Sequence, residues 1–404
     1  MRLQLMGDPT QNRAARVSPR PRQPATTGAV LAAALALPGL LPQAVQAQVT
    51  APNATLIQFK YLYYRDSQES ADRMTIHSPA LYLLTPVTDD WVFEIGAVYD
   101  DVSGASPYYH TTLSGASGLG IQDKRTQVDA TITKYFDRTS VAVRVAYSDE
   151  DDYTSTAGAV TVRHATPDQN TTFTVGGGYS GDEVSPTVGV PSKHYKRTWD
   201  ALVGISQVFT PNDVASLNVY YAEQSGYLTD PYKAYWGVDN RPNQRDQLAA
   251  QVRWNHFFDS ADATLRMGYR YYDDSWDIIA HTVTLEWAQI LPDGWLLTPG
   301  LRYTTQSAAK FYYDPVYDPI LGPPFPPGYL DNPTGYYSSD QRLSAFGGIT
   351  AGLKVSKALP AGWLIDAKAE YLEQRGDWRL GGEGSPGLEN FSAQMYQVGI
   401  TRKF

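Results

Sequence analysis

The chain contains no cysteine, which excludes disulfide bonds and thiolate metal sites. It also lacks a long apolar run: after the first residues, no stretch approaches the ~20 apolar residues that a membrane-spanning helix needs. Basic residues are scarce, with 33 Lys and Arg against 42 Asp and Glu. Because there is no basic patch to neutralise phosphates, we expect no nucleic-acid partner.

Aromatic residues are abundant, with 29 Tyr and 9 Trp, and three segments share one format. Residues 91–99, 295–303 and 363–371 each begin with Trp just after a short turn and end with Tyr eight residues later. Because eight is even, the two aromatics of a segment lie on one face of a β-strand. In a tilted strand they are about 20 Å apart, which approaches the height of the apolar band of an outer-membrane barrel.

Alternating segments of similar length continue to the end of the chain. Their links are short after even-numbered segments and usually longer after odd-numbered ones, as in barrels with short periplasmic turns and long extracellular loops. We therefore predict an all-β fold, a transmembrane antiparallel β-barrel of about sixteen strands, with fourteen or eighteen as alternatives. A soluble β-sandwich does not explain aromatics at both strand ends. The predicted strands are residues 55–65, 74–85, 91–100, 125–136, 140–149, 157–165, 171–180, 196–209, 214–223, 246–258, 263–272, 278–290, 295–305, 341–355, 363–374 and 392–404.

The N-terminal region has the pattern of an export signal. Four arginines between residues 13 and 22 precede an apolar run at 28–41, and Val45-Gln46-Ala47 is a plausible cleavage site. We predict that residues 1–47 are a cleaved secretory signal peptide, with a disordered basic tail as the alternative. Residues 48–404 are then a single barrel domain in a bacterial outer membrane.

The last predicted strand alternates and ends in phenylalanine. Tyr396, Val398, Ile400 and Phe404 share one face. This pattern resembles the C-terminal signature that the outer-membrane barrel-assembly machinery recognises, so we expect that machinery to be a partner through the strand ending in Phe404. Arg402 departs from the signature because it puts a charge where an apolar residue is usual.

Four stretches carry a resemblance to a known family: residues 102–107, 148–153, 226–233 and 269–276. They resemble a family of uncharacterised Gram-negative outer-membrane β-barrels known only as a domain of unknown function. The resemblance covers nearly the whole chain after residue 47, and it implies location and architecture without implying an activity. Through the flavin-transfer and thioredoxin-like proteins associated with the family, it also implies a periplasmic redox context.

The inward face of the predicted strands carries charged side chains. A sixteen-stranded barrel leaves an aqueous channel, in which such charges set the ion preference. The alternative is that they pair across the lumen and stiffen the wall. Arg266 and Arg270, with Arg253 on the preceding strand, form a stripe that would attract anions. The candidate lumen residues are Lys60, Arg144, Arg253, Arg266, Arg270, Glu286, Arg302, Asp366, Lys368 and Glu370.

Two long links are candidates for function. Link 306–340 holds seven prolines and is either a constriction inside the lumen or a surface cap that binds a partner. Link 224–245 contains the most specific part of the family resemblance, and a packed turn built on Asp230-Pro231 is the alternative reading. Its candidate residues are Gly226, Tyr227, Asp230, Pro231, Tyr232 and Lys233.

The sequence offers little for catalysis or metal binding. It shows no nucleophile elbow, P-loop or metalloprotease helix, so we expect no enzyme, no catalytic residue and no cofactor. His77 beside Ser78 is the basis for a weak alternative, a membrane-embedded hydrolase. The acidic clusters 149–152 and 273–277 fit solvated loops better than Ca²⁺ or Mg²⁺ sites, because no ligand-loop motif is present.

These observations favour a porin-like pore for small hydrophilic solutes or ions. The main alternative is a non-conducting barrel that docks a periplasmic partner, such as a redox protein. Outer-membrane lipid is expected to contact the outer face, and the sequence leaves the oligomeric state open.

Overall fold

The computed structural model describes residues 49–68, 71–104, 121–186, 192–235, 237–314, 320–321, 325, 328–331 and 335–404. The predicted signal peptide, residues 1–47, lies outside the described residues. Sixteen long strands make up the barrel: β1 (Leu56–Gln68), β2 (Ala71–Pro86), β3 (Trp91–Gly104), β4 (Ile121–Tyr135), β5 (Thr139–Asp149), β6 (Tyr153–Ala165), β7 (Thr171–Val184), β8 (His194–Thr210), β9 (Asp213–Gly226), β11 (Gln244–Phe258), β12 (Ala263–Asp274), β13 (Ile279–Leu291), β14 (Trp295–Gln306), β16 (Phe346–Ala358), β17 (Trp363–Arg375) and β18 (Phe391–Lys403).

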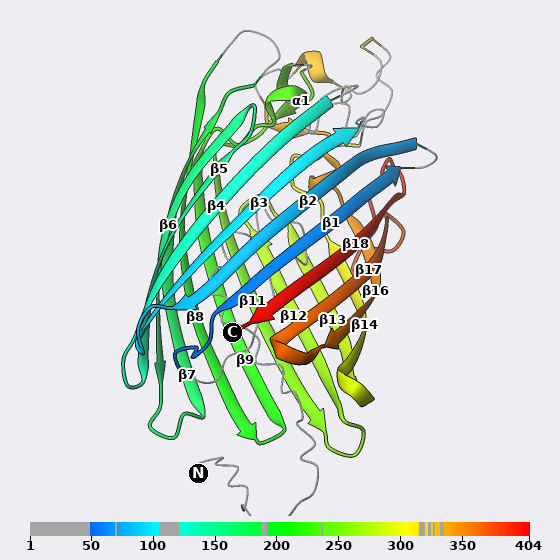
Figure 1. Ribbon diagram of the computed structural model, residues 1–404. Helices are drawn as coiled ribbons and strands as arrows, with labels where there is room; N and C mark the ends of the chain where they lie inside the picture. Colours follow the sequence, from blue (N-terminus) through cyan, green and yellow to red (C-terminus); the bar gives the residue numbers. More distant parts are fainter. Residues whose placement is uncertain are drawn as a thin grey trace, which may run out of the picture.

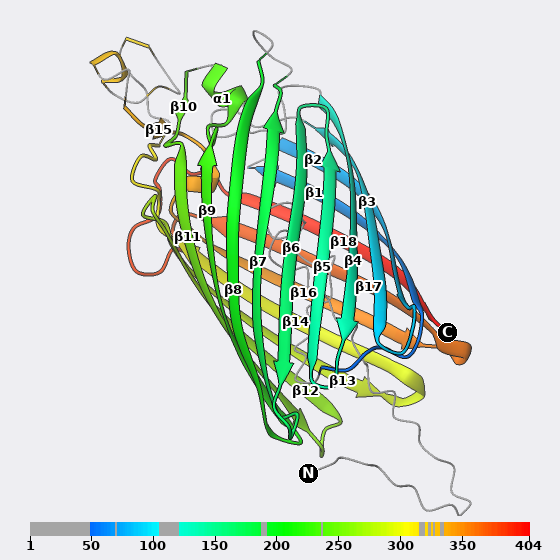
Figure 2. The same ribbon diagram turned by 90° about the vertical axis from the view of Figure 1, so that its left-hand side faces the viewer.

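The strands close into one ring. Each pairs antiparallel with its neighbours in chain order, and β1 pairs with β18 from Leu56↔Lys403 to Gln68↔Phe391. Figures 1 and 2 show the resulting tilted barrel from two sides. The predicted architecture, with sixteen strands, is confirmed. The predicted strands 74–85 and 157–165, which have the weakest alternation, are present as β2 and β6. The β2–β3 pairing skips from His77↔Asp101 to Ala80↔Val98. Pro79 lies in this gap, and proline has no backbone N–H to donate to the neighbouring strand.

The two ends of the barrel differ. At one end, here called the short-turn end, lie the tight links such as 87–90, 211–212 and 292–294, together with the start of β1 and the end of β18. At the other, the loop end, lie links 227–243 and 307–345 with the short elements α1 (Pro231–Tyr235), β10 (Asp239–Asn240) and β15 (Tyr337–Ser338). Figure 2 shows these short elements together beyond the strands. Among the described residues, no helix is long and apolar enough to cross a membrane.

Side chains alternate between the two faces of the wall. On β5, Val143, Val145 and Tyr147 face outward, and Val145 is 59% exposed. Arg144 and Ser148 face inward, and Arg144 is only 9% exposed. An apolar outer face and a polar inner face are what a barrel in hydrocarbon requires.

Each of the three Trp segments carries a cation over its first ring. Trp91, Trp295 and Trp363 are the first residues of β3, β14 and β17. Directly opposite them in the register stand the cations Lys134, Lys357 and Arg402. The cations lie 5.0, 4.7 and 4.8 Å from the respective ring centroids.

This pattern explains why Arg402 departs from the C-terminal signature. Its guanidinium group lies over the ring of Trp363 at 4.8 Å and over that of Phe404 at 5.0 Å. The charge is therefore the third member of a repeated girdle of cation–π pairs at the short-turn end, where a cation over an aromatic face is stabilised electrostatically.

The alternation predicts opposite effects for two neighbouring substitutions. Val145→Lys puts a charge on the outer face and should lower the free energy of unfolding by about 2–4 kcal/mol if it lies near the bilayer centre. Ala146→Lys, the matched control, faces inward opposite Asp129 and should change it by less than about 1 kcal/mol. Urea unfolding in lipid vesicles measures both, and equal losses would contradict the assignment of faces.

Candidate functional site

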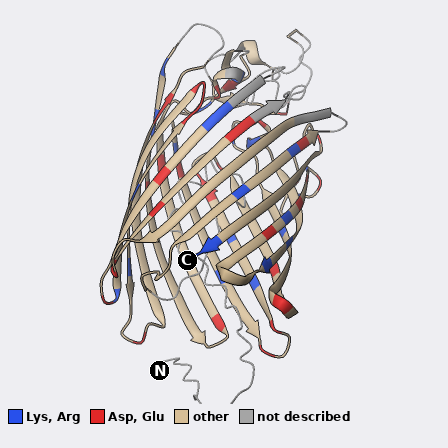
Figure 3. Ribbon diagram, viewed as in Figure 1, with Lys and Arg blue, Asp and Glu red and all other residues tan. Residues whose placement is uncertain are grey.

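The candidate lumen residues lie on the inward face of the wall, with many polar neighbours. Figure 3 shows acidic and basic residues recurring along the strands. Some of these groups are ion-paired: Arg144 with Asp129 at 3.3 Å, and Lys368 with Glu370 at 2.8 Å. Here the structure favours the pairing alternative, because a paired charge attracts solutes less than a free one.

Six inward glycines have a common arrangement. The polar side chain directly opposite lies over each of these six, so close that a Cβ on the glycine would meet it at 2.3–2.9 Å. Those distances are shorter than real Cβ contacts. The polar chain therefore lies along the wall instead of extending into the lumen. The pairs are Gly96 with Asp129, Gly178 with Asp200, Gly204 with Asn218, Gly268 with Thr284, Gly352 with Glu370 and Gly399 with Asp366.

Two of the predicted lumen residues, Asp366 and Lys60, stand on either side of one such glycine. Gly399 stands between them in the register, opposite Lys60 on one side and Asp366 on the other. Lys60 and Asp366 are both buried, and Lys354 approaches the carboxylate of Asp366 at 3.8 Å. In this part of the wall the inward charges therefore form a network around Asp366.

The wall made by β11 to β14 is different. Arg266 pairs with Glu286 at 3.5 Å, and Arg302 approaches Glu370 at 4.0 Å. Arg270 faces inward and is exposed, and among the described residues neither it nor Arg253 has a carboxylate within ion-pair distance. The three arginines that the sequence groups as a stripe do lie together, on the two paired strands β11 and β12.

Packed segments, here called the roof, lie at the loop end of strands β9 to β16: residues 227–235, 237–243, 275–278, 307–314 and 335–345. Trp276 is the centre of its apolar core, with Ile278, Ala309, Phe311 and Leu343 buried around it. Arg245 lies over the ring of Trp276 at 4.3 Å and pairs with Asp274 at 2.5 Å. The roof thus joins three links that are far apart in the sequence.

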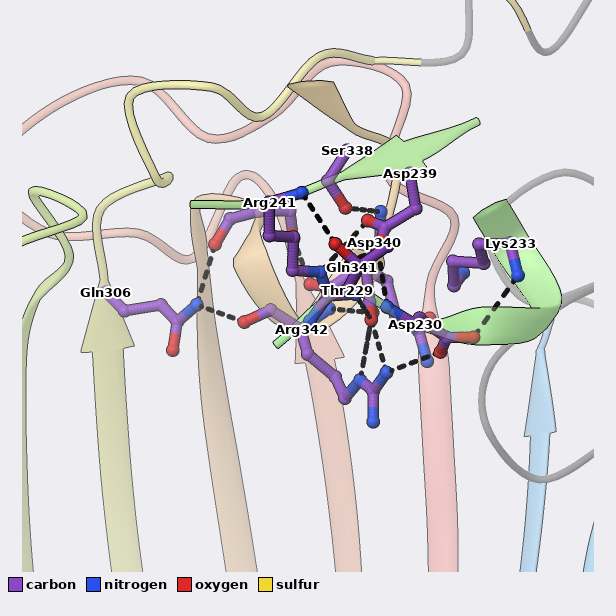
Figure 4. Close-up of polar contacts among 11 residues, drawn as sticks. Thr229, Asp230, Lys233, Asp239, Arg241, Gln306, Ser338, Asp340, Gln341 and Arg342 are labelled. Carbon is purple, nitrogen blue, oxygen red and sulfur yellow. Dashed lines mark hydrogen bonds and ion pairs between the residues drawn. The ribbon is translucent and has the colours of Figure 1, made fainter. Parts of the chain in front are cut away.

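A buried charge network holds the roof (Figure 4). Asp340 is fully buried and accepts hydrogen bonds from Arg241 Nη2 at 2.7 Å and from Arg342 Nε at 2.9 Å. Arg241 also donates to Asp239, and Arg342 to Asp230 at 3.1 Å. With Lys233, which is also buried, three cations meet three carboxylates across links 227–243 and 307–345.

The network changes the acidity of its members. Burial alone would raise the pKa of Asp340, but Arg342, Lys233 and Arg241 together hold it well below its usual range. Burial raises the pKa of Asp239 despite the opposing effect of Arg241. Burial lowers the pKa of Lys233, and its two nearby carboxylates, Asp340 and Asp230, oppose that change. Asp340 is therefore the carboxylate that the roof most strongly keeps charged.

The predicted motif in link 224–245 contributes to this buried charge network. The Asp230 carboxylate accepts from the backbone N–H of Lys233 at 3.2 Å and so caps α1, in which Pro231 is the first residue. Gly226 has φ +110°, and a Cβ there would lie 2.3 Å from the Tyr195 carbonyl oxygen, so glycine is required. The ring of Tyr227 stacks on His194 with centroids 4.0 Å apart. The side chain of Tyr232 lies outside what the structure describes.

Of the other predicted candidates, some lie outside the described residues and others do not come together in space. The seven prolines of link 306–340 lie outside the described residues, whereas residues 307–314 and 335–340 of that link belong to the roof. His77 and Ser78 point to opposite faces: His77 bonds with Tyr61 on the outer face at 2.6 Å, and Ser78 is buried on the inner face. In the part of the chain that the structure describes, no three acidic or histidine side chains form a metal-binding group.

Sequence reasoning missed Asp239, Arg241, Asp340 and Arg342. They belong to links in which no alternation or spacing marks a residue as buried. The one available signal was the pairing of Asp and Arg in 239–241 and 340–342, which recurs in both links.

Removing the charge of Asp340 should open the roof while the barrel stays folded. Asp340→Asn leaves Arg241 and Arg342 without a buried carboxylate, so the local opening free energy of the roof should fall by about 3–5 kcal/mol. Hydrogen exchange of residues 227–243 measures this. Asp151→Asn, in an exposed loop position, is the matched control and should change nothing.

This effect should depend on pH with a defined sign. The folded-state pKa of Asp340 is depressed, so its contribution is complete above the unfolded-state pKa of about 3.9. It is lost as the pH falls through the folded-state value, well below 3.8. A wild-type roof that already opens between pH 6 and pH 5 would contradict this assignment.

Comparisons with known proteins agree with the architecture. The barrel of CdiB from Acinetobacter baumannii aligns with a TM-score of 0.50 at 8% identity, covering 85% of this chain and 60% of that one. A bacterial polysaccharide outer membrane secretin gives 0.48 at 10%, covering 88% and 99%. The siderophore receptor PirA from Pseudomonas aeruginosa gives 0.43 at 11%, covering 86% and 80%. The fold resembles that of bacterial outer-membrane barrels.

The comparison with curated proteins gave no match. A family model described as "Protein of unknown function (DUF3570)" matches residues 27–118 and 108–395, which together are most of the chain. The chain belongs to the DUF3570 family of proteins of unknown function.

Proposed function

We propose that the protein is an outer-membrane pore that passes small hydrophilic solutes or ions. The observation that carries the proposal is the repeated glycine–polar pair of the inner wall. Because the side chains opposite these glycines lie along the wall, they make the interior polar while taking up less of it than extended side chains would. Several inward charges are accessible to water: Glu286 is 47% exposed and Lys354 is 39% exposed.

The proposal includes the route to the membrane. Residues 1–47 direct export, and the alternating strand β18, which ends just before Phe404, is the segment that the barrel-assembly machinery recognises. The outer face then contacts lipid through its exposed apolar residues, such as Val145, Val175 and Val203. In this reading the protein needs no cofactor and has no catalytic residue.

The absence of cysteine makes a direct test possible. Arg270→Cys places a single thiol on the inner face, and Met267→Cys, the matched control, places one on the exposed outer face of the same strand. We expect channel events from purified protein in a planar bilayer. A charged methanethiosulfonate reagent should lower the single-channel current stepwise for Arg270→Cys and leave Met267→Cys unchanged, because only the first thiol meets the permeant water.

Two results would count against the pore. Wild-type protein that gives no channel events would favour the docking barrel instead. Events that the reagent affects equally in both cysteine variants would mean that the current does not pass through the barrel interior.

A further inference from the structure

Four arginines surround one point on the inner wall of β11 to β14. Arg253 stands directly opposite Gly268 in the register, and Arg266 and Arg270 flank Gly268 on the same face of β12. Diagonal neighbours of an antiparallel pair are about 7–8 Å apart, within reach of long side chains. The same row continues from Gly268 through Thr284 to Arg302.

Small residues form the floor between these arginines. Gly268 has no side chain, and the Thr284 hydroxyl lies over it, donating to the Gly268 carbonyl at 3.5 Å. A Cβ on Gly268 would be 2.4 Å from Thr284 Oγ1, so any larger residue there would displace the Thr284 hydroxyl. Arg253 and Arg302 are three strands apart, roughly 14 Å at the usual strand spacing. Only Gly268 and Thr284 stand between Arg253 and Arg302 in this row, and this part of the wall with its four arginines is here called the recess.

The charges of this recess are unbalanced. Glu286 pairs with Arg266, whereas Glu370 is shared between Arg302 at 4.0 Å and Lys368 at 2.8 Å. Arg270 is exposed, and its guanidinium group lies over the ring of Tyr272, 5.6 Å from the ring centroid. This excess of positive charge stands in a chain that carries more acidic than basic residues overall.

The roof lies at the loop end of the strands that carry the recess. Its links join strands from β9 to β16, and the arginines lie on strands within that arc. In Figure 4 the side chain of Arg342 points from the network toward the barrel strands, and it is 58% exposed. Since β12 runs from the short-turn end to the loop end, Arg270 is nearer the roof than Arg266 is. A solute entering from the loop end meets a succession of guanidinium groups.

We propose that Arg253, Arg266, Arg270 and Arg302 form a binding site for small oxyanions on the lumen wall. The planar guanidinium group donates two parallel hydrogen bonds to a carboxylate or phosphate, which a single ammonium group cannot match. The proposal deepens the pore function and rests on it, since it names small carboxylates and phosphates as the solutes that the barrel passes. Glu286 tunes the site by neutralising one of its four cations.

Calorimetric titration of inorganic phosphate into the full-length barrel, folded in detergent, tests the site without a membrane current. Each arginine should contribute about tenfold in affinity, so Arg253→Gln with Arg270→Gln should weaken binding by about a hundredfold. Glu286→Gln should strengthen it, because the variant frees Arg266. Lys354→Gln, which removes a lumen charge on β16 outside the recess, is the matched control and should change the affinity by less than about twofold.

The sign of the Glu286→Gln effect separates a binding role from a structural one, because loss of a merely structural partner would not strengthen binding. Arg270→Gln alone guards against misfolding, since Arg270 has no ion pair among the described residues to lose. Absent phosphate binding, or equal binding by wild type and the arginine variants, would overturn the site. A barrel that conducts without binding phosphate refutes only the site, and one that binds without conducting refutes only the pore.

Discussion

The pairing of backbone hydrogen-bond groups is the constraint on which this structure depends. In hydrocarbon an unpaired N–H or C=O group has no water to bond, so a sheet that spans the membrane can have no free edge. The pairing of β1 with β18 along the whole length of both strands removes that edge. Once the ring is closed, the two faces of every strand have fixed environments, and the requirements on each side chain follow from its parity.

That division explains features that look irregular in the sequence alone. A charge at position 402 conflicts with an apolar outer face until its position opposite Trp363 is known. Glycines within strands ordinarily weaken them, because glycine has more backbone freedom to lose and no side chain to pack. Here a directly opposite polar side chain lies in the space that each glycine leaves, as Asp129 does over Gly96. The strands therefore combine close packing along the wall with a polar interior.

The alternation predicted about sixteen strands, with fourteen and eighteen left as alternatives, and the facing of their residues, because alternation is a local property that a membrane makes strict. The predicted strand 341–355 begins five residues too early, since β16 starts at Phe346 and residues 341–345 belong to the roof. The grouping of Arg253 with Arg266 and Arg270 followed from the same parity. The recess itself did not, because it depends on the register that sets Arg253 opposite Gly268, and register cannot be read from either strand alone.

The roof was beyond sequence reasoning for a related reason. Asp230 and Arg342 are separated by 112 positions, and each lies in a link without periodicity. The motif around Gly226 was correctly marked for attention, yet its partners could not be named. Only folding shows that Asp340, unremarkable in its own segment, is the fully buried centre of the network.

The roof also has a mechanical consequence. A ring of sixteen strands is held in shape by the pairing of neighbouring strands, and links that join strands further apart add to that restraint. The links after β9, β12 and β14 are joined to one another by buried ion pairs and by the Trp276 core. They therefore connect the loop ends of the strands from β9 to β16. The curvature of the wall from β9 to β16 is thereby fixed at its rim, and with it the spacing of whatever that wall presents to the interior.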